Sequence, residues 1–245
     1  MSDSPSVRRA DPAQEAPALF VPALGGALRG VLFDLDDTLV DRRAAHARAV
    51  QFLLRERLGQ VPPHALERFA LADDDGLRPR GAFCKQVVRA LPELDWTPGE
   101  LWARYAPAVA RAVRPVPGRR DALAALGERV ALGVVTNGGP LQREKLRRAD
   151  LDGLWQSVRV SGEDGCAKPE RRLFQLALAD LGLEPRDVLY VGDRPHEDID
   201  GARAAGLSTC WIQGPRVARS ARADWVVPDV EALFAALLPL AVCCG

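Results

Sequence analysis

The chain has 245 residues, of which 47% are hydrophobic, and this fits one large globular domain or a core with a small second domain. Its 33 basic and 33 acidic residues cancel, so no global field draws it to nucleic acid or to an anionic membrane, and we expect neither as a partner. No stretch approaches the roughly 20 uninterrupted apolar residues that a membrane span needs.

Residues 1–28 are rich in Ala and Pro and carry scattered acidic residues, which predicts a disordered N-terminal tail. The five cysteines are odd in number and form no C-x-x-C pair. We therefore expect reduced thiols and a cytoplasmic protein.

The segment Val31 to Leu35 is apolar and of strand length, and three carboxylates and a threonine follow its start closely. Side chains alternate faces along a strand, so Asp34 and Asp36 point the same way. Two like charges about 4 Å apart repel by roughly 4 kcal/mol at the effective dielectric of a partly exposed site. The pair therefore implies a metal, a lysine or a shared proton.

Between the first strand and the rest of the chain, residues 41–114 contain few strand-like runs. Apolar residues recur there at three- and four-residue spacing, as in Ala45, Ala49, Phe52 and Leu53, which predicts helices. Gly76 to Gly81 is the expected loop. We interpret 41–114 as a helical cap inserted beside the carboxylates.

From Pro117 onward, apolar runs alternate with amphipathic segments, which predicts a parallel sheet covered on both faces. The expected fold is α/β, with a Rossmann-like parallel-sheet core made of residues 29–40 and 115–245. Strands are expected at 130–135, 158–160, 188–191, 208–212 and 224–227, and helices at 141–149, 170–181, 197–205 and 231–240.

Polar clusters follow three of these strands: Asp34 and Asp36, then Thr136 and Asn137, then Asp193. Open parallel sheets bind ligands at the carboxyl ends of their strands, so the clusters should converge on one edge. Asp34, Asp36, Asp193 and Asp198 against Lys168 leave a negative excess that would repel a phosphate. A divalent metal would remove this contradiction.

These motifs resemble those of the haloacid dehalogenase-like hydrolase superfamily, in the subgroup whose helical cap follows the first strand. The resemblance covers about residues 29–230 and rests on four motifs in order: Asp34-Leu35-Asp36-Asp37-Thr38, Thr136-Asn137, Lys168-Pro169, and Gly192-Asp193-Arg194-Pro195-His196-Glu197-Asp198.

The resemblance implies that Asp34 attacks a phosphoryl group and carries an aspartyl-phosphate, and that Asp36 acts as general acid and then general base. Asp34, the backbone carbonyl of Asp36, and Asp193 would hold Mg²⁺, with Asp198 behind them. The phosphoryl group would be bound by Asp34, Thr136, Asn137 and Lys168, and Thr136 and Lys168 would also serve catalysis.

An acid at position 36 favours phosphoester hydrolysis over dehalogenation, because an alkoxide leaving group benefits from a proton donor and a halide does not. The alternatives are a phosphomutase of the same family and a non-catalytic phosphate-binding module. Asp34→Asn would separate an enzyme from a binding module. One sequence does not decide between a monomer and a homodimer.

The expected substrate is a small phosphorylated metabolite, and the stretches 135–139 and 142–146 resemble those of nucleotidase-like and sugar-phosphate phosphatases. Specificity should come from cap residues that face the cleft. The candidates for binding a second anionic or polar group are Arg42, Arg43, His46, Arg78, Arg80 and Lys85.

Overall fold

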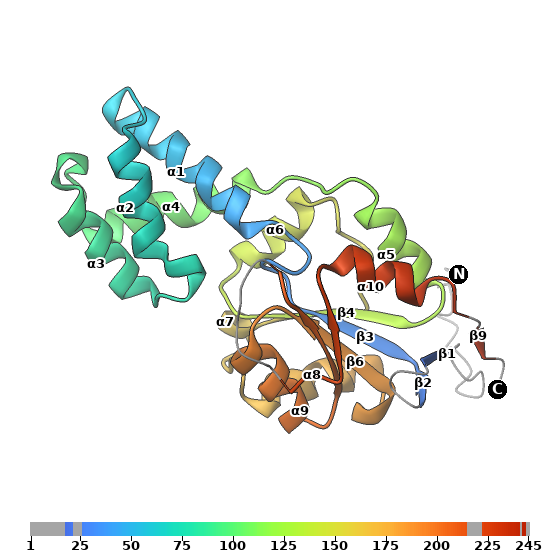
Figure 1. Ribbon diagram of the computed structural model, residues 1–245. Helices are drawn as coiled ribbons and strands as arrows, with labels where there is room; N and C mark the ends of the chain where they lie inside the picture. Colours follow the sequence, from blue (N-terminus) through green and yellow to red (C-terminus); the bar gives the residue numbers. More distant parts are fainter. Residues whose placement is uncertain (1–17, 22–25, 215–221, 241, 244–245) are drawn as a thin grey trace, which may run out of the picture.

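A six-stranded, fully parallel sheet forms the centre of the molecule (Figure 1). The computed structural model describes residues 18–21, 26–214, 222–240 and 242–243. The strand order is β5-β4-β3-β6-β7-β8. These strands are β3 (Gly30–Phe33), β4 (Ala131–Thr136), β5 (Ser157–Val160), β6 (Val188–Gly192), β7 (Ser208–Ile212) and β8 (Trp225–Val227).

Helices cover both faces of this sheet, and the predicted Rossmann-like α/β fold is confirmed. Alternate residues of β3 belong to two separate apolar clusters: Val31 and Phe33 to one, Leu32 to the other. The first cluster includes residues of α5 (Arg119–Gly127), α6 (Leu141–Arg148) and α10 (Val230–Leu237). The second includes residues of α8 (Arg171–Leu181) and α9 (Gly201–Ala204).

The strand order places the chemistry. From β3 the chain steps through β4 to β5 on one side and then returns to β6 on the other side of β3. Phe33 is level with both Val134 and Val191. The residues that follow these three positions therefore leave the sheet at one edge, at the point where the strand order reverses.

Four helices fill the inserted segment and pack on one another: α1 (Arg42–Leu58), α2 (Pro63–Asp73), α3 (Arg80–Ala90) and α4 (Pro98–Ala112). Asp41 caps α1 by accepting a hydrogen bond from the Ala44 amide at 2.8 Å. Thr97 and Glu100 form a capping box at the start of α4. This four-helix unit extends away from the sheet, and α4 also contacts α6 (Figure 1).

Two expectations from the sequence need correction. Residues 18–21 and 26–28 were expected in a disordered tail, but they form β1 (Ala18–Val21) and β2 (Gly26–Leu28), which pair in an antiparallel sheet with β9 (Val242–Cys243). Residues 1–17 and 22–25 lie outside the described residues. The loop expected at 76–81 ends earlier, because α3 already begins at Arg80.

Helix α5 was not predicted, because its short sequence Arg-Arg-Asp-Ala-Leu-Ala-Ala-Leu-Gly buries only Leu123 and Leu126. The predicted 197–205 helix is also different: a π-helix at Pro195–Asp200 precedes α9. Among the described residues, no helix has both the length and the apolar character to cross a membrane.

We predict that Phe33→Ala lowers the free energy of unfolding by about 3–5 kcal/mol, because the ring is fully buried and lies against Trp155 and Phe234. Phe52→Ala is the matched control: its ring is 56% exposed, so it should change stability by only about 0.5 kcal/mol. Urea denaturation measures both, and equal losses in the two variants would contradict this account of the core.

Candidate active site

A buried lysine joins the first and last motifs. Lys168 Nζ donates to Asp34 Oδ1 at 2.6 Å and to Asp198 Oδ1 at 2.6 Å. The three side chains are almost fully buried, with exposed fractions of 5% for Lys168, 5% for Asp34 and 0% for Asp198. The sequence placed these residues 134 positions apart in two cases and 30 in another, and the sheet edge brings them together.

Asp193 completes an acidic cluster with Asp34 and Asp198, and one oxygen of each lies within 4.8 Å of the others. Lys168 is the cation hydrogen-bonded to this cluster. Burial, strengthened by Asp198, raises the pKa of Asp34 to about 7 despite the opposing effect of Lys168. Burial, with the charges of Asp34 and Asp198, raises the pKa of Asp193 to about 8. Such a set of hard oxygen donors with excess negative charge suits a divalent cation.

Backbone geometry holds the cluster in shape. The amide of Arg194 donates to Asp198 Oδ2 at 2.9 Å, and Trp211 Nε1 donates to the carbonyl of Asp193 at 3.0 Å. Gly192 is required at the end of β6, because a Cβ there would lie 2.4 Å from Asp198 Cγ. The glycine of this motif therefore makes room for the carboxylate beside Lys168.

Tyr190 is a site residue that the sequence analysis missed. It is fully buried on β6, accepts a hydrogen bond from Lys168 Nζ at 2.9 Å and donates to Asp198 Oδ1 at 2.9 Å. Within the sequence it is one apolar-run residue among others, so only its alternation with Leu189 and Val191 could have suggested the direction of its side chain.

Asn137 has a different role from the expected one. Its side chain accepts from the Lys168 amide at 2.8 Å and donates to the Lys168 carbonyl at 3.0 Å. Both ends of the amide are thus used to hold the backbone of Lys168. The expected contact between this side chain and a phosphate is corrected: Asn137 positions the lysine instead.

Asp36 lies at the same edge but has its own cation. Lys145 Nζ lies 2.7 and 2.6 Å from the two carboxylate oxygens, and Gln142 Nε2 donates to Oδ2 at 3.0 Å. Burial acts to raise the pKa of Asp36, but the charge and hydrogen bonds of Lys145 outweigh it and hold that pKa below its usual value. Neither Lys145 nor Gln142 was among the predicted site residues, although both lie in the 142–146 stretch that the sequence analysis singled out.

The six cap candidates separate into two groups. Arg42 lies near Asp36 and contributes to lowering its pKa, but its guanidinium binds Asp73 at 3.0 and 2.5 Å. His46 Nδ1 is 2.7 Å from the Tyr105 hydroxyl and 3.7 Å from Asp73, and burial lowers its pKa.

Arg43 reaches the same region. Its amide donates to Asp37 Oδ1 at 3.3 Å, and its Nε lies 3.4 Å from Asp75 Oδ1.

The other three candidates bond elsewhere in the four-helix unit. Arg78 donates to the Ala72 carbonyl at 2.7 Å, Arg80 lies over the Trp102 ring at 4.6 Å, and Lys85 is exposed. No contact found for them in the described part of the chain involves a motif residue. The expectation that these three face the cleft is not supported, because helical spacing alone did not show which side of the unit faces the sheet.

One core residue contacts the four-helix unit close to the acidic cluster. Arg194 Nη2 donates to the Gly76 carbonyl at 2.9 Å, and its Nη1 lies 3.4 Å from Glu197. The turn that carries Gly76 is the 3₁₀ helix η2 (Asp74–Gly76), in which all three residues have positive φ. This turn therefore lies next to the residue that follows Asp193.

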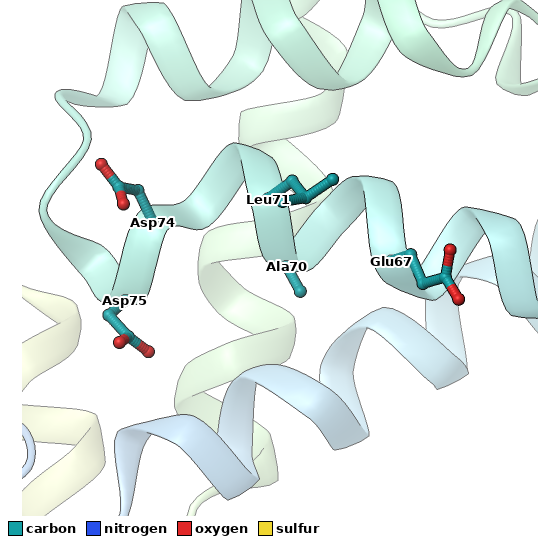
Figure 2. Close-up of a pocket in the computed structure, with 5 residues that line it drawn as sticks. All are labelled: Glu67, Ala70, Leu71, Asp74 and Asp75. Carbon is teal, nitrogen blue, oxygen red and sulfur yellow. The ribbon is translucent and has the colours of Figure 1, made fainter. Parts of the chain in front are cut away.

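A cavity of about 590 Å³ lies on the four-helix unit, lined by Glu67, Ala70, Leu71, Asp74 and Asp75 (Figure 2). None of these is a motif residue, and three are acidic. A lining of this charge disfavours a phosphorylated ligand, so the acidic edge of the sheet, and not this cavity, is the candidate active site.

The comparisons with known proteins agree with this geometry. Residues 28–206 match the family described as haloacid dehalogenase-like hydrolase. The chain is 29% identical to the glyceraldehyde 3-phosphate phosphatase of Pyrococcus furiosus over 86% of its own length and 93% of that protein. It is 41% identical to the phosphoserine phosphatase of Thermus thermophilus, but over only 54% of this chain and 55% of that one.

Among solved structures, the fold resembles the HAD-hydrolase YfnB of Bacillus subtilis, a structure bound to magnesium, with a TM-score of 0.74 and 23% identity. The match covers 86% of this chain and 98% of that one. At this identity the likeness shows a shared fold.

We predict that, without divalent metal, folding stability falls as the pH rises from about 5.5 to 8. The unfolded carboxyls of Asp34 and Asp193 are ionised in this window, whereas the native ones keep protons because their pKa values are raised to about 7 and about 8. Stability is therefore fully present below the unfolded pKa of 3.8 and is lost through the native values. Each retained proton contributes a slope of about 1.4 kcal/mol per pH unit.

Urea denaturation in EDTA across this pH range measures the slope. Asp193→Asn should flatten it, because the variant removes one of the two carboxyls and relieves the other. Asp95→Asn, which changes a carboxylate that is 90% exposed, should leave the slope unchanged. Parallel curves for wild type and Asp193→Asn would contradict the assignment.

Proposed function

The chain belongs to the haloacid dehalogenase-like hydrolase family as a hydrolase of phosphoric monoesters, and we propose that it is a Mg²⁺-dependent phosphatase that forms an aspartyl-phosphate at Asp34. The observation that carries the proposal is the position of Asp34: a buried carboxylate at the carboxyl end of the central strand, bonded to Lys168 and grouped with Asp193 and Asp198. A nucleophile, a cation and a set of metal ligands are thus within one cluster.

In this mechanism Asp34 attacks phosphorus as the bond to the leaving oxygen breaks. Lys168 fixes the orientation of the Asp34 carboxylate through Oδ1 and offsets negative charge that would repel the phosphate. Asp36 delivers a proton to the leaving oxygen and later removes one from the water that hydrolyses the intermediate. Thr136, which is 1% exposed at the end of β4, is placed to donate its hydroxyl proton to a phosphoryl oxygen.

Mg²⁺ would be held by Asp34, the backbone carbonyl of Asp36 and Asp193, with Asp198 behind them, and when bound it would neutralise the phosphoryl group for attack. The fit rests on the raised pKa values of Asp34 and Asp193, to about 7 and about 8, which mark carboxylates that lack enough positive charge. A divalent cation would replace these protons.

We propose that residues 41–114 act as the cap of this active site. Support comes from the Arg194–Gly76 and Arg43–Asp75 contacts, which hold the η2 turn beside the motif residues. The substrate is expected to be a small sugar phosphate or nucleotide, and the glyceraldehyde 3-phosphate phosphatase that aligns over most of both chains favours the sugar phosphate. The cytoplasmic location expected from the sequence fits the unpaired thiols of Cys84, Cys166 and Cys210.

We predict that Asp34→Asn abolishes phosphate release from a broad panel of phosphorylated metabolites, by at least about 1,000-fold, because the amide is not a nucleophile. Asp200→Asn, which changes a carboxylate that is 61% exposed near the same cluster, should retain wild-type rates. Turnover by a folded Asp34→Asn variant would disprove the covalent mechanism. Conversion of a sugar phosphate to its isomer without phosphate release would identify a phosphomutase instead.

We predict that removing metal with EDTA stops turnover and that added Mg²⁺ restores it. Mg²⁺ should also raise the thermal unfolding temperature of the wild type, because a ligand that binds only the native state stabilises it. Asp193→Asn should lose most of this increase. Full turnover in excess EDTA, or an equal thermal shift in the variant, would exclude the metal assignment.

A further inference from the structure

Helix α6 presents two buried polar side chains to the active site, and the mechanism above gives neither of them a role. Gln142 and Lys145 are three residues apart, so they share one face of the helix. Their exposed fractions are 4% and 8%, whereas Arg148 on the same helix is exposed and pairs with Glu144. Lysine is rarely buried to this extent unless it is paired.

Gln142 bridges two residues of the proposed chemistry. Its Nε2 donates to Thr136 Oγ1 at 2.7 Å and to Asp36 Oδ2 at 3.0 Å. A hydroxyl has one proton to donate, and Thr136 accepts from Gln142, so its own proton is left to point away from α6. The Gln142 amide therefore sets the direction in which Thr136 donates.

The chain makes room for this bridge at Gly138. The backbone φ there is +153°, and a Cβ at this position would lie 2.8 Å from Gln142 Cγ. Glycine after Thr136-Asn137 thus lets the Gln142 side chain pass close to the β4 end, which explains a residue that otherwise reads only as part of a turn.

Lys145 holds the second partner. Its Nζ contacts both oxygens of Asp36, at 2.7 and 2.6 Å, and this carboxylate accepts from Gln142 as well. When Asp36 gives its proton to the leaving oxygen, it becomes a carboxylate in a largely buried place. A neighbouring ammonium stabilises that carboxylate as it forms.

We propose that Gln142 and Lys145 are positioning residues: Lys145 supports proton donation by Asp36, and Gln142 aligns both Asp36 and the Thr136 hydroxyl. This proposal rests on the proposed function and deepens it. The bond between phosphorus and the leaving oxygen breaks as Asp34 bonds to phosphorus, and the proton of Asp36 moves to the leaving oxygen. Lys145 and Gln142 exchange no proton and act through Asp36 and Thr136.

Two aryl phosphates test this assignment, because they differ mainly in their need for a proton donor. Phenolate is a poor leaving group, since a phenol such as tyrosine has a pKa of about 10, whereas the nitro group of 4-nitrophenyl phosphate lets its phenolate leave without a proton. We expect Lys145→Met to lower kcat/KM about tenfold or more with phenyl phosphate and no more than about threefold with 4-nitrophenyl phosphate.

Arg148→Met is the matched control, because it removes a positive charge from the exposed side of the same helix. It should leave both rates unchanged. Asp36→Asn should show the same preference between substrates as Lys145→Met. In the Asp36→Asn background, Lys145→Met should cause no further substrate-dependent loss, because it acts through the group already removed.

Gln142→Leu should behave differently, since Thr136 serves every substrate. We expect lower kcat/KM with both aryl phosphates and weaker competitive inhibition by inorganic phosphate. An equal loss with both substrates in Lys145→Met, or a substrate-dependent loss that persists without Asp36, overturns the role of Lys145. Unchanged phosphate inhibition in Gln142→Leu overturns the role of Gln142.

Thermal unfolding of every variant separates this outcome from a folding defect. Should Lys145→Met not fold because Asp36 is left unpaired, Lys145→Gln keeps one donor and is expected to show the same substrate preference, and its absence there also overturns the assignment. Asp34→Asn is measured alongside. Turnover in that variant refutes the proposed function, whereas an Asp34-dependent enzyme without the substrate preference refutes only the role of α6.

Discussion

The active-site edge depends on an imbalance of buried charge. Asp34, Asp193 and Asp198 lie within 4.8 Å of one another, with Lys168 as the cation hydrogen-bonded to two of them. Removing carboxylates from water is costly, and close like charges add to the cost. The fold accepts this instability at the carboxyl ends of its central strands, where a metal and a phosphate would jointly balance it.

The second cation at this edge divides the acidic residues into two groups. Lys168 serves the nucleophile cluster, whereas Lys145 serves Asp36 alone. The effect on the pKa values is opposite: that of Asp34 is raised and that of Asp36 is lowered. Two carboxylates two residues apart on one strand end therefore have different chemical environments, which is the condition for different roles in one reaction.

The four-helix unit is tied to this edge through a turn of unusual backbone conformation. Arg194, next to Asp193, donates to the Gly76 carbonyl, and the η2 turn that holds Gly76 has positive φ at all three residues. Positive φ in non-glycine residues is uncommon, and such residues persist where their surroundings hold them. The contact links the approach of the helical unit to the same segment that carries the acidic cluster.

The sequence by itself determined the alternation of strands and helices, the helical insertion, and the motif residues at three strand ends, because apolar periodicity and turn chemistry are local. It did not determine what each polar side chain bonds to. Gln142, Lys145 and Tyr190 reach the site only through packing between α6, β4 and β6, and Asn137 turned from phosphate to Lys168 for the same reason. Helical spacing likewise left Arg42 and Arg80 equivalent, and only the tertiary contacts placed one beside Asp36 and the other over Trp102. Partners distant in sequence are decided by tertiary packing, which no local pattern encodes.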